Sequence, residues 1–225
     1  MPQASTPTLE EVLAKAAELQ ALVPGAVLVG GAAAALHAGH RHTFDDDHVI
    51  ADLHDRFDTI LEHLDALGDW SLARAQAGKV ILGSLGGIES GIRQLIRRQP
   101  LETMTVDVDG HPLVVPTVEE TLRIKAWLAV TRNQTRDYLD IAALADRTGV
   151  TDAATILARI DDYYADINRR PDAVATQVVR QLAEPRPRDE QTTRELAHYK
   201  GLDPRWHDWA EVRRVLAAVA EAMLT

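Results

Sequence analysis

Strand patterns in this chain of 225 residues stop at Pro116, and this change limits the fold more than any other feature. Before it, short apolar runs alternate with helical patterns, and Met104–Val108, Asp109-Gly110 and Pro112–Val115 predict a hairpin with a type I′ turn. After it, apolar residues recur at helical spacing almost to the C-terminus. We therefore expect strands mixed with helices in residues 1–116 and a helical domain in residues 117–225.

Capping patterns and apolar spacing predict the individual elements. Thr8 and Glu11 form a capping-box pattern, and the helix that they begin is expected to end at Pro24-Gly25. Thr117 and Glu120 repeat this pattern at the start of the helical half. Further helices are predicted over residues 32–38 and 53–67, and further strands over residues 26–29, 79–82 and 91–96.

The composition excludes several classes of protein. The chain has 34 acidic and 24 basic residues, a formal net charge of −10 and no cysteine, which excludes a disulfide scaffold and a cysteine nucleophile. No run approaches the roughly 20 apolar residues of a membrane helix, and the N-terminus lacks the features of a signal peptide. We therefore expect a cytoplasmic protein without membrane association. Its negative charge argues against indiscriminate binding to nucleic acid.

The clearest chemical signal lies between Gly30 and Asp47. Glycines between a strand and a helix let backbone N–H groups approach an anion, although Gly30-Gly31 would equally suit a tight turn. On a strand, Asp45 and Asp47 would share one face and Asp46 would lie on the other. Two carboxylates suit Mg²⁺, which takes its remaining ligands from water and substrate phosphates. A solvated acidic loop explains the three aspartates equally well.

Four histidines accompany these aspartates, namely His37, His40, His42 and His48. No two of them have the spacing of a helical zinc-binding motif. We expect loop residues, or groups that contact a phosphate or a base, rather than a dedicated zinc site.

A second group of charged residues lies in the helical half. Lys125 and Arg132 are seven residues apart, so they are expected to share one face of a continuous helix. Arg136 and Asp140 have the spacing of a helical ion pair, and Thr135 is expected to cap a second helix. Salt bridges between two amphipathic helices explain this group if it stands alone. Nucleotidyl transfer requires such cations together with a metal site on another element.

Three motifs, in this order, resemble the AbiEii/AbiGii-type nucleotidyltransferase toxins of the polymerase-β-like nucleotidyltransferase superfamily. They are Val29-Gly30-Gly31, Gly39-His40-Arg41-x-Thr43-x-Asp45-x-Asp47, and Lys125-x6-Arg132-x3-Arg136-Asp137-x2-Asp140. The resemblance runs from about Val27 to Ala145. It implies an α+β fold, with a nucleotidyltransferase core of mixed sheet and flanking helices in residues 1–116, and a helical domain in residues 117–225 closing over the site.

The resemblance also implies a role for each matching residue. Asp45 and Asp47 would hold Mg²⁺ or Mn²⁺ against the phosphates of a nucleoside triphosphate (NTP), and they would be catalytic together with Lys125 and Asp137. Lys125 would offset phosphate charge, and Asp137 matches the acid of the family's later motif. Contacts to the nucleotide would come from Gly30, Gly31, Arg41, Thr43, Lys125 and Arg132.

Members of this family are toxins of toxin–antitoxin pairs, and some transfer nucleotides to the 3′ end of tRNA. For this chain, the resemblance implies attack of an acceptor hydroxyl on the α-phosphorus, release of pyrophosphate, and a cognate antitoxin as partner. Two alternatives stay open. One is transfer of AMP to a protein hydroxyl, and the other is a module that binds a nucleotide or a partner but has lost catalysis.

Two features depart from the family's pattern. Many of these enzymes carry a third carboxylate on a later central strand, where this chain has Gln94. Glu89 or Asp107 would replace it if the fold brings either close, and Asp137 is a further candidate for the base. The negative net charge means that tRNA would have to bind to local basic clusters, at Arg93, Arg97 and Arg98 and around Lys125.

Overall fold

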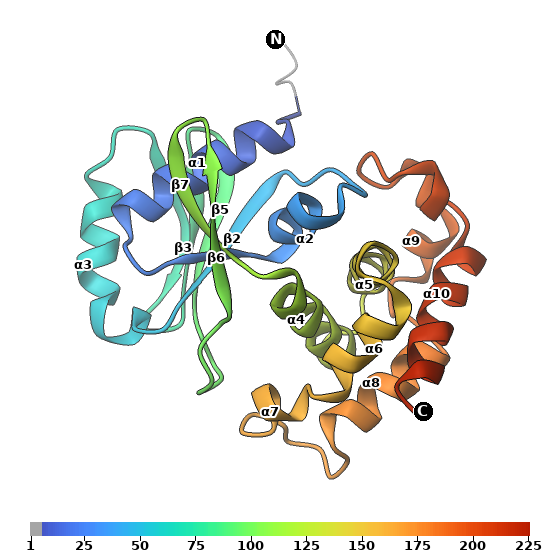
Figure 1. Ribbon diagram of the computed structural model, residues 1–225. Coiled ribbons are helices and arrows are strands. Elements are labelled where there is room, and N and C mark those ends of the chain that lie inside the picture. Colours follow the sequence, from blue (N-terminus) through green and yellow to red (C-terminus); the bar gives the residue numbers. More distant parts are fainter. Residues whose placement is uncertain (1–5) are drawn as a thin grey trace. The chain divides into compact units, whose positions relative to one another are not determined.

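The computed structural model describes residues 6–225, which divide into two compact units (Figure 1). The first unit comprises the described residues up to Leu36, together with His42–Ile96 and Glu102–Pro116. The second comprises His37–Arg41, Arg97–Leu101 and Thr117–Thr225. The predicted fold class is confirmed, because the chain combines a mixed sheet and flanking helices with a helical C-terminal region.

The first unit is built on a mixed sheet of five strands among its described residues, in the order β1-β2-β5-β4-β3. Strand β2 runs parallel to β5, and the other neighbouring strands are antiparallel. The bounds of these strands are β1 Val27–Val29, β2 Asp45–Ile50, β3 Trp70–Gln76, β4 Val80–Leu85 and β5 Ile88–Gln94. The accompanying helices are α1 Leu9–Leu22, α2 Gly30–Ala38 and α3 Leu53–Asp65.

Local sequence signals account for most of these elements. The predicted capping box is confirmed, because the Glu11 N–H donates to the Thr8 hydroxyl and the Thr8 N–H donates to the Glu11 carboxylate. Helix α2 begins two residues earlier than predicted, at Gly30. Strand β5 covers residues 88–94 rather than 91–96. Strand β3 was not predicted, because its side chains are nearly all exposed and show no apolar alternation.

Two apolar clusters form the core of the first unit. One lies between α3 and the sheet, where Phe57 and Ile60 pack with Ile50, Ile81 and Ile92. The other lies around α1, which packs against β1 and a separate hairpin. The sheet is therefore covered by α1 and α3 on the face to which the side chain of Ile50 belongs.

The separate hairpin consists of β6 (Thr103–Val108) and β7 (His111–Pro116). Its predicted type I′ turn is confirmed by positive φ angles at Asp109 (51°) and Gly110 (82°). The Gln20 side chain of α1 pairs with both backbone groups of Val114 at 2.8 Å. The alternate residues Pro112 and Pro116 have no N–H to offer on this edge, so β7 is closed to further strand pairing.

The second unit is a helical bundle centred on α5. Nearly every residue of this helix from Thr135 to Ala145 is buried, and α4, α6 and α10 pack around it. None of the helices in residues 6–225 is long and apolar enough to cross a membrane. The bounds are α4 Val118–Thr131, α5 Thr135–Thr148, α6 Val150–Ala158, α7 Asp161–Tyr164, α8 Val174–Ala183, α9 Glu190–Arg194, η1 Leu196–His198, η2 Pro204–Trp206 and α10 Trp209–Ala222.

A buried arginine anchors the segment Arg97–Leu101 in this second unit. Arg97 is 4% exposed and lies 2.6 Å from the carboxylate of Glu120, which also accepts a bond from Arg123 at 2.9 Å. Its guanidinium lies 4.8 Å from the ring centre of Tyr164. The charge of Arg97 is therefore compensated inside the unit. The prediction that Arg97 contributes to a basic surface is wrong.

The contact between Gln20 and Val114 predicts the stability of the Gln20→Leu variant. Leucine would leave the Val114 N–H and C=O without their partners, so we expect a loss of about 1–3 kcal/mol in the free energy of unfolding. Urea unfolding followed by circular dichroism measures this loss. The matched control is Gln76→Leu on the exposed edge strand β3, which should change stability by less than about 0.5 kcal/mol. Equal effects of the two substitutions would contradict this role of Gln20.

Candidate functional site

Strand β2 presents two aspartates on one face. Asp45 and Asp47 are partly exposed, whereas Asp46 between them is fully buried on the other face, as predicted for a strand. The buried Thr43 hydroxyl donates to the Asp45 carboxylate at 3.0 Å. This bond orients one of the two carboxylates and leaves both on a face that a ligand can reach.

Two glycines make room for the carboxylate of Asp47. A Cβ atom on Gly91 would lie 2.8 Å from Asp47 Oδ1, and one on Gly30 would lie 3.2 Å from the Asp47 Cβ. Gly30 also has a φ of +73°, which L side chains rarely adopt. Gly30 and Gly31 together form the first turn of α2, where free backbone N–H groups favour an anion.

The strand register brings one further carboxylate alongside this pair. Glu89 of β5 is exposed and in register with Asp45 of the parallel strand β2, so their side chains leave the sheet on the same face. Gln94 instead bonds the backbone of His54 and Ala51 at the start of α3. Asp107 accepts the N–H of Gly110 in the β6–β7 turn. Of the two carboxylates predicted to replace the missing one, Glu89 and Asp107, only Glu89 is aligned with the aspartates by the sheet.

The donor set on this face fits a metal ion that takes part of its coordination from a substrate. Among residues 6–225, no group of three histidine or carboxylate side chains is arranged to hold a metal ion by itself. Asp45 and Asp47 supply two carboxylates on one face, and Mg²⁺ commonly binds through one or two carboxylates together with phosphates and water. Arg93 lies 3.5 Å from Asp47 Oδ1 and offsets part of this negative charge.

The opposite face of β2 carries a buried polar group that sequence reasoning missed. Asp46 accepts a 2.8 Å bond from the Ser90 hydroxyl, and His48 Nδ1 lies 3.2 Å from the other oxygen of Asp46. Asp46 and Ser90 are register partners on β2 and β5. Their bond therefore ties together the two strands that carry Asp45, Asp47 and Glu89.

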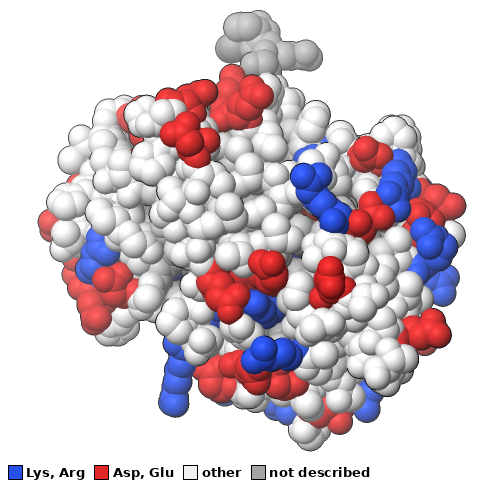
Figure 2. All heavy atoms as spheres, in the orientation of Figure 1, with Lys and Arg blue, Asp and Glu red and all other residues white. Residues whose placement is uncertain are grey.

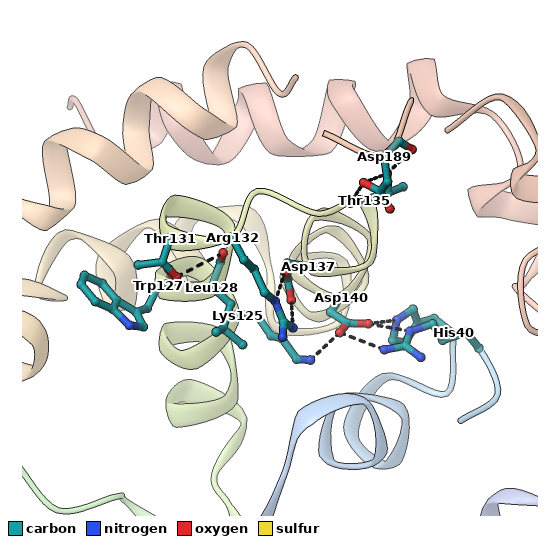
Figure 3. Close-up of polar contacts among 11 residues, drawn as sticks. His40, Lys125, Trp127, Leu128, Thr131, Arg132, Thr135, Asp137, Asp140 and Asp189 are labelled. Atoms are coloured by element: carbon teal, nitrogen blue, oxygen red, sulfur yellow. Dashed lines mark hydrogen bonds and ion pairs between the residues drawn. The ribbon is translucent and has the colours of Figure 1, made fainter. Parts of the chain in front are cut away.

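In the second unit, three nitrogen-bearing side chains converge on one carboxylate, and we call these four residues the Asp140 cluster (Figure 3). Asp140 Oδ1 accepts bonds from His40 Nε2 and Arg41 Nε, both at 2.8 Å. Its Oδ2 lies 2.7 Å from Lys125 Nζ and 3.0 Å from Arg41 Nη2. Figure 3 shows Lys125 and His40 reaching Asp140 from opposite sides. All four residues are at most 5% exposed.

The cationic neighbours of Asp140 keep its carboxylate ionised. Burial alone raises the pKa of Asp140, but the charges of Arg41 and Lys125 and the bond from His40 outweigh it and hold that pKa well below 3.8. The carboxylate is therefore ionised and only accepts, so the proton of His40 lies on Nε2. Two cationic side chains, Arg41 and Lys125, therefore lie against one buried carboxylate. Cations held in place are the groups that stabilise the negative charge of phosphates.

Three predictions about the residues around the turn between α4 and α5 are wrong. Arg132 lies just past the end of α4, where it forms a bidentate bond with the buried Asp137 at 2.6 and 2.7 Å, so it does not continue the helix face of Lys125. Gln134 occupies the capping position, and the Thr135 hydroxyl and N–H donate to Asp189. Asp140 bonds the residues of its cluster rather than Arg136.

The structure distributes the predicted site residues over both units. The first unit holds Gly30, Gly31, Thr43, Asp45 and Asp47, and the second holds Arg41, Lys125, Arg132 and Asp137. Within the first unit, both glycines and Thr43 accompany the aspartates. Within the second unit, Arg41 and Lys125 share one carboxylate, and Arg132 and Asp137 form a separate pair.

Comparison with solved structures identifies the fold. A candidate nucleotidyltransferase from H. pylori has a TM-score of 0.51 at 15% identity, over 95% of this chain and 92% of that one. The antibiotic-resistance factor ANT(2″)-Ia has a TM-score of 0.50 at 13% identity, over 70% of this chain and 94% of that one. The fold is nucleotidyltransferase-like. At these identities the similarity concerns the fold alone.

Sequence comparison finds part of this chain in much longer proteins. The mycolic acid-containing lipids exporter MmpL11 of Mycolicibacterium smegmatis is 42% identical over 129 residues, and the heme uptake protein MmpL11 of Mycobacterium tuberculosis is 40% identical over 131 residues. Each match covers 57% of this chain and 13% of the relative. The chain thus corresponds to a small part of these relatives. No protein-family model matches the chain.

The lowered pKa of Asp140 predicts how stability depends on pH. Asp140→Asn would leave Arg41 and Lys125 buried without their counterion, at a cost of about 3–5 kcal/mol near neutral pH. Since the folded pKa is lowered, the contribution of Asp140 is complete above 3.8 and is lost as the pH falls below that value. Urea unfolding of wild type and variant should therefore show a constant difference down to about pH 5 that shrinks in stronger acid.

The control for this measurement is Asp58→Asn, an exposed carboxylate on α3. It should leave stability within about 0.5 kcal/mol of wild type. A difference between wild type and Asp140→Asn that already shrinks between pH 7 and 5 would contradict the lowered pKa.

Proposed function

We propose that this protein is a metal-dependent nucleotidyltransferase, which transfers a nucleoside monophosphate from an NTP to an acceptor hydroxyl and releases pyrophosphate. One observation carries the proposal. A nucleotidyltransferase-like fold presents two accessible carboxylates on one face of a strand, Asp45 and Asp47, and the same chain groups two cations, Arg41 and Lys125, in the Asp140 cluster. Carboxylates for a metal and cations for phosphates are the two parts that this chemistry requires.

The first unit would supply the ligands of the metal ion. Asp45 and Asp47 would hold Mg²⁺ or Mn²⁺, which when bound neutralises charge on the phosphates and on the attacking and leaving oxygens. Gly30 and Gly31 would offer N–H groups of the first turn of α2 to the triphosphate, and Thr43 would keep Asp45 oriented. These residues position the reactants rather than react with them.

The second unit supplies the cations. Arg41 and Lys125 would offset the negative charge of the triphosphate, helped by Arg132, which is partly exposed.

The acceptor hydroxyl must lose a proton as it attacks the α-phosphorus. Asp137 is fully buried and bonded twice to Arg132, whereas Glu89 is exposed and in register with Asp45. We therefore favour Glu89 as the base, which accepts the hydroxyl proton while the bond to the pyrophosphate breaks. Asp137 would then keep Arg132 oriented toward the nucleotide.

The motif resemblance extends the proposal to a biological role. The protein would be the toxin of a toxin–antitoxin pair in the cytoplasm, acting on the 3′ end of tRNA and held inactive by a cognate antitoxin. Of the predicted basic clusters, Arg97 and Lys125 are buried and paired, which leaves the exposed Arg93 and Arg98 for RNA contacts. On the face shown in Figure 2, most basic side chains have acidic neighbours, so RNA binding would be local and sensitive to salt.

Substitution of the two aspartates tests the enzymatic proposal. The assay incubates each of the four α-³²P-labelled NTPs with Mg²⁺ and total tRNA. Asp45→Asn and Asp47→Asn should each lower transfer by roughly 100-fold or more, since each removes a charge from the metal site. Stability should hardly change, because both carboxylates are partly exposed.

The control is Asp65→Asn at the exposed end of α3, which should transfer like wild type. Label on the protein rather than on tRNA would replace the tRNA acceptor with a protein acceptor. Nucleotide binding without transfer of label by wild type would favour the module that has lost catalysis.

The space over Gly91 gives a second prediction. In Gly91→Ala the new methyl group would displace the Asp47 carboxylate, which lies 2.8 Å from its position, so transfer should fall roughly tenfold or more. The fold should lose only about 1 kcal/mol, because the two atoms that must move, Asp47 Oδ1 and Leu82 Cδ2 at 3.1 Å, both end flexible side chains. Gly68→Ala is the matched control, since a Cβ there meets nothing within 4 Å. Equal transfer activity of Gly91→Ala and Gly68→Ala would contradict a role of Asp47 in the reaction.

A further inference from the structure

We propose that Asp140 is a positioning residue, which holds Arg41 and Lys125 in the arrangement that receives the triphosphate. This inference rests on the proposed function, because it assumes that these two cations bind the nucleotide. The role proposed for Asp140 differs from that of the cations, because Asp140 would not contact the nucleotide. Asp140 would act through the two cations, and its own negative charge would oppose phosphate binding.

The contacts of Asp140 fix both cations at once. Each carboxylate oxygen contacts two nitrogen atoms, and the four distances lie between 2.7 and 3.0 Å. Arg41 uses the edge formed by Nε and Nη2, which sets the plane of its guanidinium. Lys125 directs one of its three N–H groups at Asp140. His40 bonds Oδ1 and thereby restrains the carboxylate itself.

The cluster also joins three parts of the chain, two helices and one irregular segment. Lys125 and Asp140 belong to the packed helices α4 and α5, whereas His40 and Arg41 lie in the irregular segment between α2 and β2. The backbone of that segment is held at His40 O by the N–H of Asp203, at 2.8 Å. Arginine and lysine side chains lose much rotamer freedom when they are fixed. A cation that is already fixed before the ligand arrives lowers the cost of binding.

Charge and positioning predict opposite results for Asp140→Asn. If charge alone mattered, removing the carboxylate would make the cluster more positive by one charge, and a triphosphate would bind more tightly. If Asp140 positions Arg41 and Lys125, the same substitution releases both cations and the triphosphate binds more weakly. The direction of the change therefore distinguishes the two roles.

The experiment measures the dissociation constant of each of the four NTPs with Mg²⁺ by titration calorimetry, for wild type and Asp140→Asn, per folded molecule. We expect roughly tenfold weaker binding of the preferred NTP, equivalent to the loss of one well-placed charged hydrogen bond. A double-mutant cycle with Arg41→Gln should show that most of this effect disappears once Arg41 is absent. A purely structural role would lower the folded fraction and leave the dissociation constant unchanged.

Equal or tighter binding by folded Asp140→Asn would overturn the positioning role and leave the proposed function intact. If wild type binds none of the four NTPs, the proposed function fails and this inference falls with it. The two failures are therefore distinguishable.

A second variant covers the case in which Asp140→Asn does not fold. His40→Ala leaves the carboxylate and both cations in place but frees one side of Asp140, so we expect roughly threefold weaker binding. The matched control in the same unit is the exposed His198→Ala, which should bind like wild type. Unchanged binding by His40→Ala would overturn the positioning role in that case.

Discussion

The ionised carboxylate of Asp140 is the contact that holds the predicted cations Arg41 and Lys125 within the second unit. It is fully buried, and burial of a charge is unfavourable unless partners surround it. His40, Arg41 and Lys125 supply those partners, and in return the carboxylate fixes all three. One interaction therefore fastens an irregular segment of the N-terminal half to α4 and α5. The same interaction concentrates positive charge at one place in a chain of net charge −10.

In the first unit the carboxylates of Asp45 and Asp47 are partly exposed rather than buried. Asp45 and Asp47 cannot be fixed by burial, so the surroundings fix the strand instead. The bond between Asp46 and Ser90 holds β2 to β5 from the buried face, and the absence of side chains at Gly30 and Gly91 leaves space for the Asp47 carboxylate. Rigidity on one face of β2 thus supports access on the other.

Elements and contacts near in sequence were predictable, and those set by long-range pairing were not. The capping box at Thr8 and the hairpin turn at Asp109-Gly110 follow from residues a few positions apart, and both are confirmed. The Asp46–Ser90 and Arg41–Asp140 contacts join residues 44 and 99 positions apart, and their sequence carries no local signal. The i,i+4 spacing of Arg136 and Asp140 was misleading, because a buried aspartate bonds the cations that surround it in space.

The distribution of charge narrows the class of acceptor that the proposed enzyme could use. A triphosphate with bound Mg²⁺ would need contacts from only a few cations, so a net charge of −10 does not oppose its binding strongly. RNA binding depends instead on many surface contacts to phosphates. Arg97, Arg123 and Lys125 are buried and paired, so they add nothing to such a surface. An RNA acceptor would therefore have to enter by a short single-stranded end, which needs few contacts outside the site.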